Sequence, residues 1–97
     1  METKKIAELK EGENTTVEAD VLEVYDVEEI VKKDGTRIPM QEVLIDDHSA
    51  GIILKLWGDK ANTLKQNDRV RVVGYVRAFK VKLELTIGKY GKIEVIK

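Results

Sequence analysis

Apolar residues alternate with polar ones over several short segments of the 97-residue chain, and β-branched Val and Ile dominate the apolar set. Alternation with a period of two is typical of a β-strand that buries one face. The first such run covers residues 15–21 and continues at Leu22 and Val24 on the opposite parity, which a bulge or sharp bend in one long strand would produce. Ahead of it, Ile6 and Leu9 have the spacing of one helical turn, which Gly12 would end.

The middle of the chain predicts a hairpin. Its charged tip, Lys32 to Arg37, separates two apolar runs and contains Asp34-Gly35, a dipeptide suited to a tight turn with positive φ. A second strand is expected over residues 38–45, with Pro39 near its start, where a missing backbone donor does least harm. Residues 46–51 are expected to form the next turn.

The third expected strand, residues 52–57, carries the most informative alternation. Its core face holds Ile52, Leu54 and Leu56, while its outer face holds Ile53, Lys55 and Trp57. An aromatic ring and a cation therefore share the face directed away from the core. Gly58 is expected to end this strand, and Asp59 is expected to cap a short helix over residues 60–64 that turns Ala61 and Leu64 inward.

Two further strands follow the expected helix. Residues 69–77 place a second aromatic ring, Tyr75, among cations on the outer face, with Val70, Val72, Gly74 and Val76 inward. After a short link over residues 78–80, the alternation over residues 81–87 places Lys82, Glu84 and Thr86 outward and Val81, Leu83, Leu85 and Ile87 inward. A last short strand carries Ile93 and Val95.

Composition and charge narrow the classes of protein. Apolar residues make up 42% and charged residues 36%, which fits one globular domain over residues 1–97, complete or cut from a longer protein. The chain has no cysteine, which excludes a disulfide, a thiolate metal site and a cysteine nucleophile. No apolar run approaches the length of a membrane span, so a membrane partner is not expected. The expected location is intracellular and nucleoid-associated. Residues 1–47 hold 14 acidic and 6 basic side chains, against 4 acidic and 11 basic in residues 48–97. The basic half can form a positive face for an anionic partner, or can simply be solvated charge.

The order of the expected elements is a long bent strand, a hairpin, a third strand, a short helix and two more strands. This is the order of the oligonucleotide-binding (OB) fold, a five-stranded Greek-key barrel of the all-β class. That fold uses its second and third strands, with the loops between strands one and two and between strands four and five, to hold oligonucleotides or oligosaccharides.

Several segments resemble the OB domains of archaeal single-stranded-DNA-binding proteins and replication protein A. The resemblance rests on Val43 to Gly58, Asn67-Asp68-Arg69-Val70, Tyr75 to Lys80 and Leu83-Glu84-Leu85, and it extends from Ile6 onward. Its most specific element is Leu54-Lys55-Leu56-Trp57-Gly58 with the aspartate-led turn before it. In that turn Asp47-His48-Ser49-Ala50 stands where Asp-Glu-Thr-Gly is usual, and Gly51 is expected to take the flexible role. The resemblance implies that Trp57, Tyr75 and Phe79 stack on bases.

The residues support the same interpretation, because a sequence-tolerant binder of single strands needs aromatic platforms for bases and cations for phosphates. The expected phosphate contacts are the cations of the hairpin, the third strand and the loop after the fourth: Lys32, Lys33, Arg37, Lys55, Arg77, Lys80 and Lys82. Single-stranded DNA in replication, recombination or repair is the expected partner, with no cofactor, and replication or repair proteins are possible partners.

Alternatives remain at this point. Trp57 could cover the rim of the core, Tyr75 could be structural, and Tyr25 and Tyr90 are assigned to packing at the barrel edge. His48 lies in an acidic turn, for which a solvated turn is a better interpretation than a metal site. No phosphate loop, nucleophile elbow or spaced pair of acids predicts an enzyme. An RNA-binding domain and an assembly subunit whose acidic first half docks a basic protein are the competing functions.

Overall fold

The computed structural model describes residues 3–88 and 91–96. In these residues the chain forms seven strands and two 3-10 turns: η1 (Ile6–Glu8), β1 (Asn14–Val24), β2 (Glu28–Val31), β3 (Arg37–Asp46), β4 (Gly51–Trp57), η2 (Gly58–Lys60), β5 (Arg69–Phe79), β6 (Lys82–Ile87) and β7 (Lys92–Val95). No helix in this part of the chain is long and apolar enough to cross a membrane.

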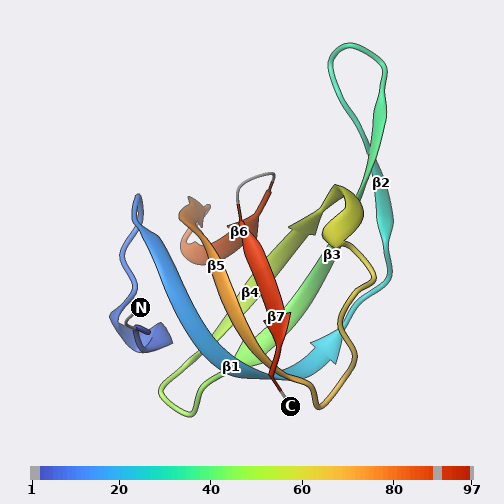
Figure 1. Ribbon diagram of the computed structural model, residues 1–97. Coiled ribbons are helices and arrows are strands. Elements are labelled where there is room, and N and C mark those ends of the chain that lie inside the picture. The colour runs from blue at the N-terminus through green and yellow to red at the C-terminus, as the bar shows by residue number, and fades with distance from the viewer. Residues whose placement is uncertain (1–2, 89–90, 97) are drawn as a thin grey trace.

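Five of the strands close into a ring in the order β1, β3, β4, β6, β5 and back to β1 (Figure 1). All neighbours in the ring are antiparallel except β4 and β6, which run parallel. The short strand β7 pairs with β5. The predicted five-stranded OB barrel is confirmed, and closure leaves its five strands without a free edge along the ring.

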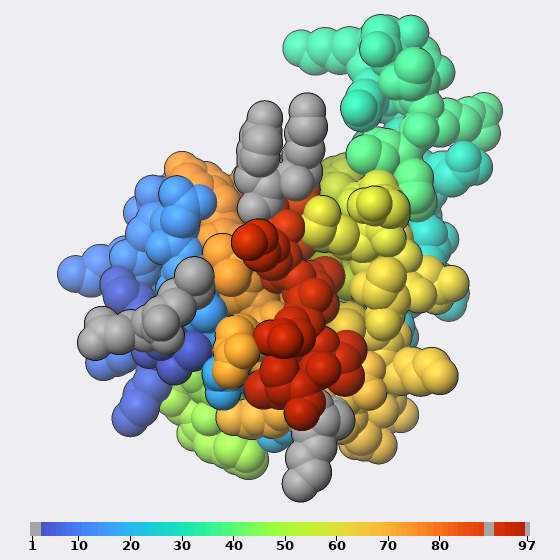
Figure 2. Space-filling model, viewed as in Figure 1, coloured from blue at the N-terminus to red at the C-terminus, as the bar shows by residue number. Residues whose placement is uncertain are grey.

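The strand β2, which the sequence pattern did not separate from the hairpin tip, pairs with the start of β3. Together they form a two-stranded hairpin that projects beyond the barrel, seen at the upper right of Figure 1 and standing off the body of the molecule in Figure 2. Its tip is well formed, because Gly35 has a φ of 86° and Asp34 accepts hydrogen bonds from the amide and hydroxyl of Thr36 at 3.0 and 2.6 Å. The predicted hairpin is therefore confirmed.

The long first strand serves two neighbours. Its first half pairs with β5 and its second half with β3, and the register of the second pairing shifts between Val21 and Glu23. This is the predicted bulge, with Leu22 as the extra residue. The parity of the buried positions changes there, so that the strand can turn the corner of the barrel while keeping apolar side chains inside.

The core lies inside the ring and consists almost entirely of aliphatic side chains. Those with no exposed surface come from every strand of the ring: Val17, Ala19, Val21, Val43, Ile45, Leu54, Leu56, Val70, Val72, Val76, Leu85 and Ile87. Leu64 is buried as expected, although the loop that carries it is not a helix. At Gly74, an added Cβ would lie 2.5 Å from Cδ1 of Ile87 and 2.8 Å from the backbone oxygen of Thr86, so only glycine fits this close approach of β5 to β6.

The helix expected over residues 60–64 is wrong. The segment forms only the 3-10 turn η2, and Asn62, with a φ of 65°, is in the left-handed region that interrupts a right-handed helix. Asp59 makes no capping hydrogen bond, because the residue at the N-cap is Trp57. The expected flexible role of Gly51 is also wrong: the residue with positive φ in that turn is His48, at 74°.

The expected boundary between the last two long strands also differs from the structure. Ala78 and Phe79 belong to β5 and pair with Leu83 and Lys82, so the turn is only Lys80-Val81. This hairpin reaches beyond the end of the barrel, where an inward parity no longer means burial. Val81 is consequently 95% exposed and Leu83 is 36% exposed, whereas both were expected to be inside. Glu84, expected outside, is buried.

The aspartate of the turn between β3 and β4 fastens the N-terminal segment to the barrel. Asp47 accepts hydrogen bonds from the amide of Ile6 at 2.8 Å and from the amide and hydroxyl of Ser49 at 2.9 and 2.6 Å. Burial alone would raise the pKa of Asp47, but these bonds and a longer one from the amide of Ala50 lower it to about 2. Ser49 in turn accepts a bond from the amide of Ala7.

Candidate functional site

The outer faces of β4, β5 and β6 bring together two of the predicted aromatic residues. The indole Nε1 of Trp57 donates a hydrogen bond to Oγ1 of Thr86 at 3.0 Å, and Thr86 is the cross-strand partner of Tyr75. Both rings thus flank one threonine of the central strand. The indole is half-buried and held by its edge, a bond that does not use the faces of the ring, while Tyr75 is 42% exposed.

The third predicted aromatic residue lies at the far end of β5 and is bracketed by cations. The ring of Phe79 is 50% exposed, with the ammonium nitrogens of Lys55 and Lys80 at 4.9 and 5.6 Å from its centroid. These distances are within the range of a cation–π contact. The structure therefore brings cations to the ring of Phe79.

The lysine at the centre of this face is already paired. Nζ of Lys55 lies 3.3 Å from a carboxylate oxygen of Glu84 and 4.0 Å from one of Glu42, and only 17% of its side chain is exposed. A phosphate that approached Lys55 would meet two carboxylates beside one ammonium. Arg77, opposite Glu84 in the register of β5 and β6, is more exposed.

A groove opens beside Phe79, between the hairpin of β5 and β6 and the outer face of β3 and β4. Its volume is about 690 Å³, within the range of small-molecule sites. Its walls are mainly apolar: Ile6, Leu44, Ile53, Phe79, Val81 and Leu83. Its polar side chains are Lys80, Lys82 and Glu84. The N-terminal turn held by Asp47 supplies Ile6 to this wall.

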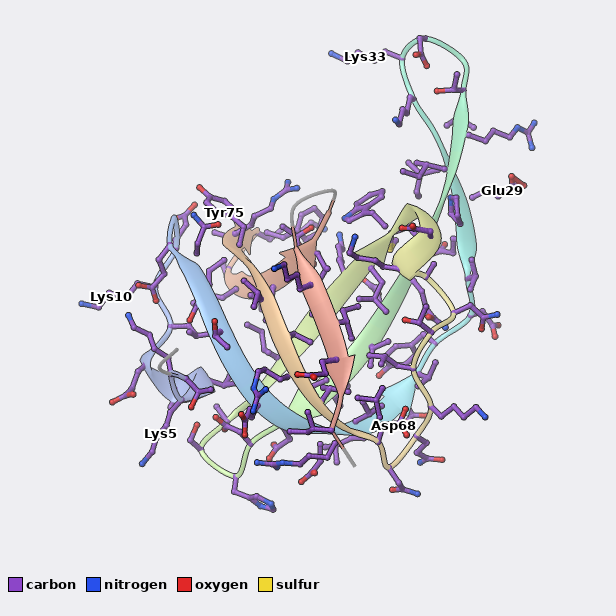
Figure 3. The ribbon with its side chains drawn as sticks, in the orientation of Figure 1. Lys5, Lys10, Glu29, Lys33, Asp68 and Tyr75 are labelled. Carbon is purple, nitrogen blue, oxygen red and sulfur yellow. The ribbon has the colours of Figure 1, made fainter. Side chains whose placement is uncertain are left out.

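The remaining predicted cations lie on the projecting hairpin and are not brought next to the aromatic residues. Figure 3 shows Lys33 at the tip of the hairpin and Tyr75 near the rim of the barrel, both toward the upper end of the view, with Asp68 at the opposite end. Lys32 lies at the same tip, and its amide and carbonyl close the turn through Thr36 and Gly35. Arg37 makes a long ion pair of 3.8 Å with Glu29, both side chains being largely exposed.

Sequence reasoning missed the groove. Val81 and Leu83 were assigned to the core, and nothing in the alternation marks where a hairpin leaves the barrel; the exposed pair Phe79-Lys80 was the available signal. Tyr25, assigned to edge packing, lies just past β1 with its amide bonded to the carbonyl of Glu42 at 3.1 Å and 43% of its surface exposed. Tyr90 lies outside the described residues.

The imidazole of His48 lies 3.5 Å, from Nε2, from a carboxylate oxygen of Asp20, while its backbone amide donates a hydrogen bond to Oδ1 of Asp46 at 2.7 Å. Within residues 3–88 and 91–96, no three His, Asp or Glu side chains converge on a position for a metal ion.

A closed five-stranded barrel of this topology places the chain in the OB-fold class, whose members hold oligonucleotides or oligosaccharides. Residues 8–95 match the family described as "Single-stranded DNA binding protein Ssb-like, OB fold". The chain belongs to this family.

Individual relatives agree with the family. The chain is 31% identical over 91 residues to the single-stranded DNA binding protein Ssb of Saccharolobus solfataricus, a match that covers 92% of this chain and 61% of that protein. The chain therefore spans under two thirds of the length of this curated relative.

Two solved structures from archaea have the same fold as this chain. The second OB-fold domain of replication protein A from Methanococcus maripaludis is 29% identical and superposes with a TM-score of 0.87, covering 99% of this chain and 96% of that domain. The replication factor A related protein from Methanobacterium thermoautotrophicum, at 19% identity, supports the fold alone, with a TM-score of 0.83 and coverage of 98% and 91%.

Proposed function

We propose that this domain binds single-stranded DNA across the outer face of β4, β5 and β6, as a non-enzymatic module of replication, recombination or repair. The observation that carries the proposal is the exposure of Tyr75, which lies near the edge-held Trp57, and of Phe79 at the end of the same strand, with Lys80 and Lys82 at the rim. Exposed aromatic side chains grouped on one face of a small domain are typical of a surface that binds a ligand or another macromolecule. Unpaired bases offer flat π-faces that fit them.

In this mechanism the three rings stack on bases and the cations at the two edges of the face contact phosphates. Stacking contributes roughly 1 to 3 kcal/mol per base. A base that stacks on Phe79 takes the place of the exposed Lys80 over the ring, and the displaced ammonium is then free to reach the neighbouring phosphate. The phosphate contacts proposed on the hairpins are Lys32, Lys33, Arg37, Arg77, Lys80 and Lys82.

Lys55 was also predicted as a phosphate contact and stays a proposal in that role. Its pairing with Glu84 and Glu42 means that a phosphate must compete with carboxylates already in place. We therefore expect Lys55 to contribute less to the salt dependence of binding than Lys80 does.

The competing function, an assembly subunit that docks a basic protein on the acidic first half of the chain, has less support. Two of the acids on β1 are engaged within the domain: Glu18 with Arg71 at 2.7 Å and Asp20 with Arg69 at 3.3 Å. Internal ion pairs reduce the negative field available to a partner. RNA would use the same face as DNA, so it is an outcome of the test below.

The test is a titration of the fluorescence of Trp57, the single tryptophan of the chain, with oligothymidine at low and high salt. Oligouridine and duplex DNA serve as comparisons. We expect strong quenching by single strands, weakened by salt, and little change with duplex. The variant Trp57→Ala, followed by fluorescence anisotropy of a labelled oligonucleotide, should bind roughly 1 to 3 kcal/mol more weakly.

Val95→Ala is the matched control, because Val95 is an exposed apolar residue on β7, away from this face. It should bind like the parent. A folded parent protein that binds neither single-stranded DNA nor RNA would overturn the proposal and favour the assembly subunit. Tighter binding of oligouridine than of oligothymidine would assign the face to RNA.

A further inference from the structure

The groove beside Phe79 combines three features, of which the stacking mechanism uses only the lysines. Its walls are apolar, its outer rim carries the two lysines Lys80 and Lys82, and a single carboxylate, that of Glu84, lines it. A nucleotide has a matching layout, since a flat apolar ring carries polar groups on one edge and is linked to a phosphate on the other side.

We propose that this groove binds one nucleobase that carries an exocyclic amino group, with Glu84 as the acceptor for that group. This inference rests on the proposed function, because the base must arrive as part of a bound single strand. It adds a base preference to a face that stacking alone would leave indifferent to sequence.

The carboxylate of Glu84 has the capacity for this bond. One of its oxygens faces Lys55 at 3.3 Å, whereas a carboxylate offers about four acceptor positions over its two oxygens. The residue is buried and the ammonium of Lys55 lies beside it, so the carboxylate is held in place. A carboxylate accepts a hydrogen bond from the N4 amino group of cytosine. The O4 carbonyl of thymine or uracil has no hydrogen to donate, and the carboxylate repels it electrostatically.

The charges around the groove also set the orientation of the strand. Glu84 and Glu42 outnumber Lys55 at the centre of the face, so the phosphates are expected to lie outside, where Lys80 and Lys82 rise from the turn and the start of β6. With phosphates at that rim, the bases point toward the barrel. Phe79 then forms the wall on which the inserted base stacks.

The experiment compares nonamers of deoxycytidine, deoxyuridine and deoxythymidine, by competition against a labelled oligothymidine on the unaltered protein. Cytosine and uracil share a pyrimidine ring, but cytosine has the N4 amino donor and an acceptor at N3 where uracil has the O4 carbonyl and an N3–H donor, and uracil against thymine isolates the methyl group. We expect deoxycytidine to bind about tenfold more tightly than deoxyuridine, which is the discrimination that one good contact to a base edge provides. Equal affinity of the two, with strong binding of both, would overturn the groove proposal and leave the proposed function standing.

A pair of variants assigns the preference to Glu84. Glu84→Gln removes the charge and keeps the size of the side chain. The affinity for deoxycytidine relative to deoxyuridine should therefore fall from about tenfold to between about onefold and threefold. Glu94→Gln makes the same change on β7, in an ion pair with Arg71 at 3.0 Å, and should keep the full ratio. A full ratio in folded Glu84→Gln would overturn the role of this carboxylate. The nucleotide comparison on the parent protein decides the base preference even if that variant does not fold, and absence of binding to every nonamer would overturn the proposed function itself.

Discussion

The hydrogen bonds that converge on Asp47 make a definite prediction about stability. The change is Asp47→Asn, which keeps the shape of the side chain but loses its charge and turns one acceptor into a donor that faces an amide. Relative to the usual value of 3.8, the pKa of this carboxyl is lowered to about 2. Each unit corresponds to about 1.4 kcal/mol, which gives an upper value of about 2.5 kcal/mol at neutral pH. Since the group is partly open to solvent, we expect about 1 to 2 kcal/mol.

The dependence on pH has a fixed sign. Because the pKa is lower in the folded protein, this contribution is complete above about pH 5 and is lost as the pH falls from about 4 toward 2. The assay is urea unfolding followed by the fluorescence of Trp57, for the parent and the variant at pH 7 and pH 2.5. The difference in the free energy of unfolding between the two should shrink over that interval.

Asp34→Asn is the matched control. Asp34 accepts the same kind of local bonds, from the amide and hydroxyl of Thr36, and its pKa is also lowered, mainly by the hydroxyl. It lies on the projecting hairpin, however, and fastens no second segment to the barrel, so its replacement should change stability much less. A difference between the parent and Asp47→Asn that is as large at pH 2.5 as at pH 7 would refute the reasoning.

Three further outcomes are expected. Gly74→Ala should lower the free energy of unfolding by about 1 to 3 kcal/mol in urea titrations, since its methyl group would overlap Ile87 and the Thr86 carbonyl, whereas Gly88→Ala, with open space around it, should be close to neutral; equal effects would contradict the packing argument. Leu54→Ala should lower the free energy of unfolding, measured by thermal denaturation, by about 2 to 5 kcal/mol, because Leu54 is fully buried inside the ring of strands. Lys80→Gln should make the slope of log affinity against log salt shallower by about 0.7, and an unchanged slope would remove Lys80 from the phosphate contacts.

Sequence patterns were sufficient for the ring of the barrel because most of its strand positions alternate between buried and more exposed side chains. The face of β4 followed directly from the parity of Leu54, Lys55 and Trp57, and the bulge in β1 followed from the change of parity near Leu22. These are local signals, and a strand that buries one face must show them. The helix after Trp57 failed because caps and spacing are weak signals over five residues, and the left-handed Asn62 was not foreseeable from them.

The candidate site was only partly predictable, because it depends on where elements end relative to one another. That Trp57 and Tyr75 both flank Thr86 follows from the parallel pairing of β4 with β6, which no local pattern specifies. The exposure of Val81 depends on how far the last hairpin extends past the barrel. The ion pair of Lys55 with Glu84 depends on the pairing of β4 with β6. The sequence therefore shows that Lys55 is charged, but it does not show which carboxylate lies beside it.

The direction of the projecting hairpin depends on the number of residues in β1, because the extra residue Leu22 bends the strand ahead of it. Gln66 fixes the bulged residue by donating from Nε2 to its carbonyl at 3.1 Å, while the side chain of Leu22 is exposed. A substitution at Leu22 should therefore leave the hairpin where it is. Removing the residue would instead restore regular pairing, with Val21 and Val24 both still facing inward, and would take away the bend that directs the chain from β1 toward the projecting hairpin. One deleted codon, in a strand that contributes none of the proposed contacts, would therefore change the direction in which three of the proposed phosphate contacts, Lys32, Lys33 and Arg37, project from the barrel.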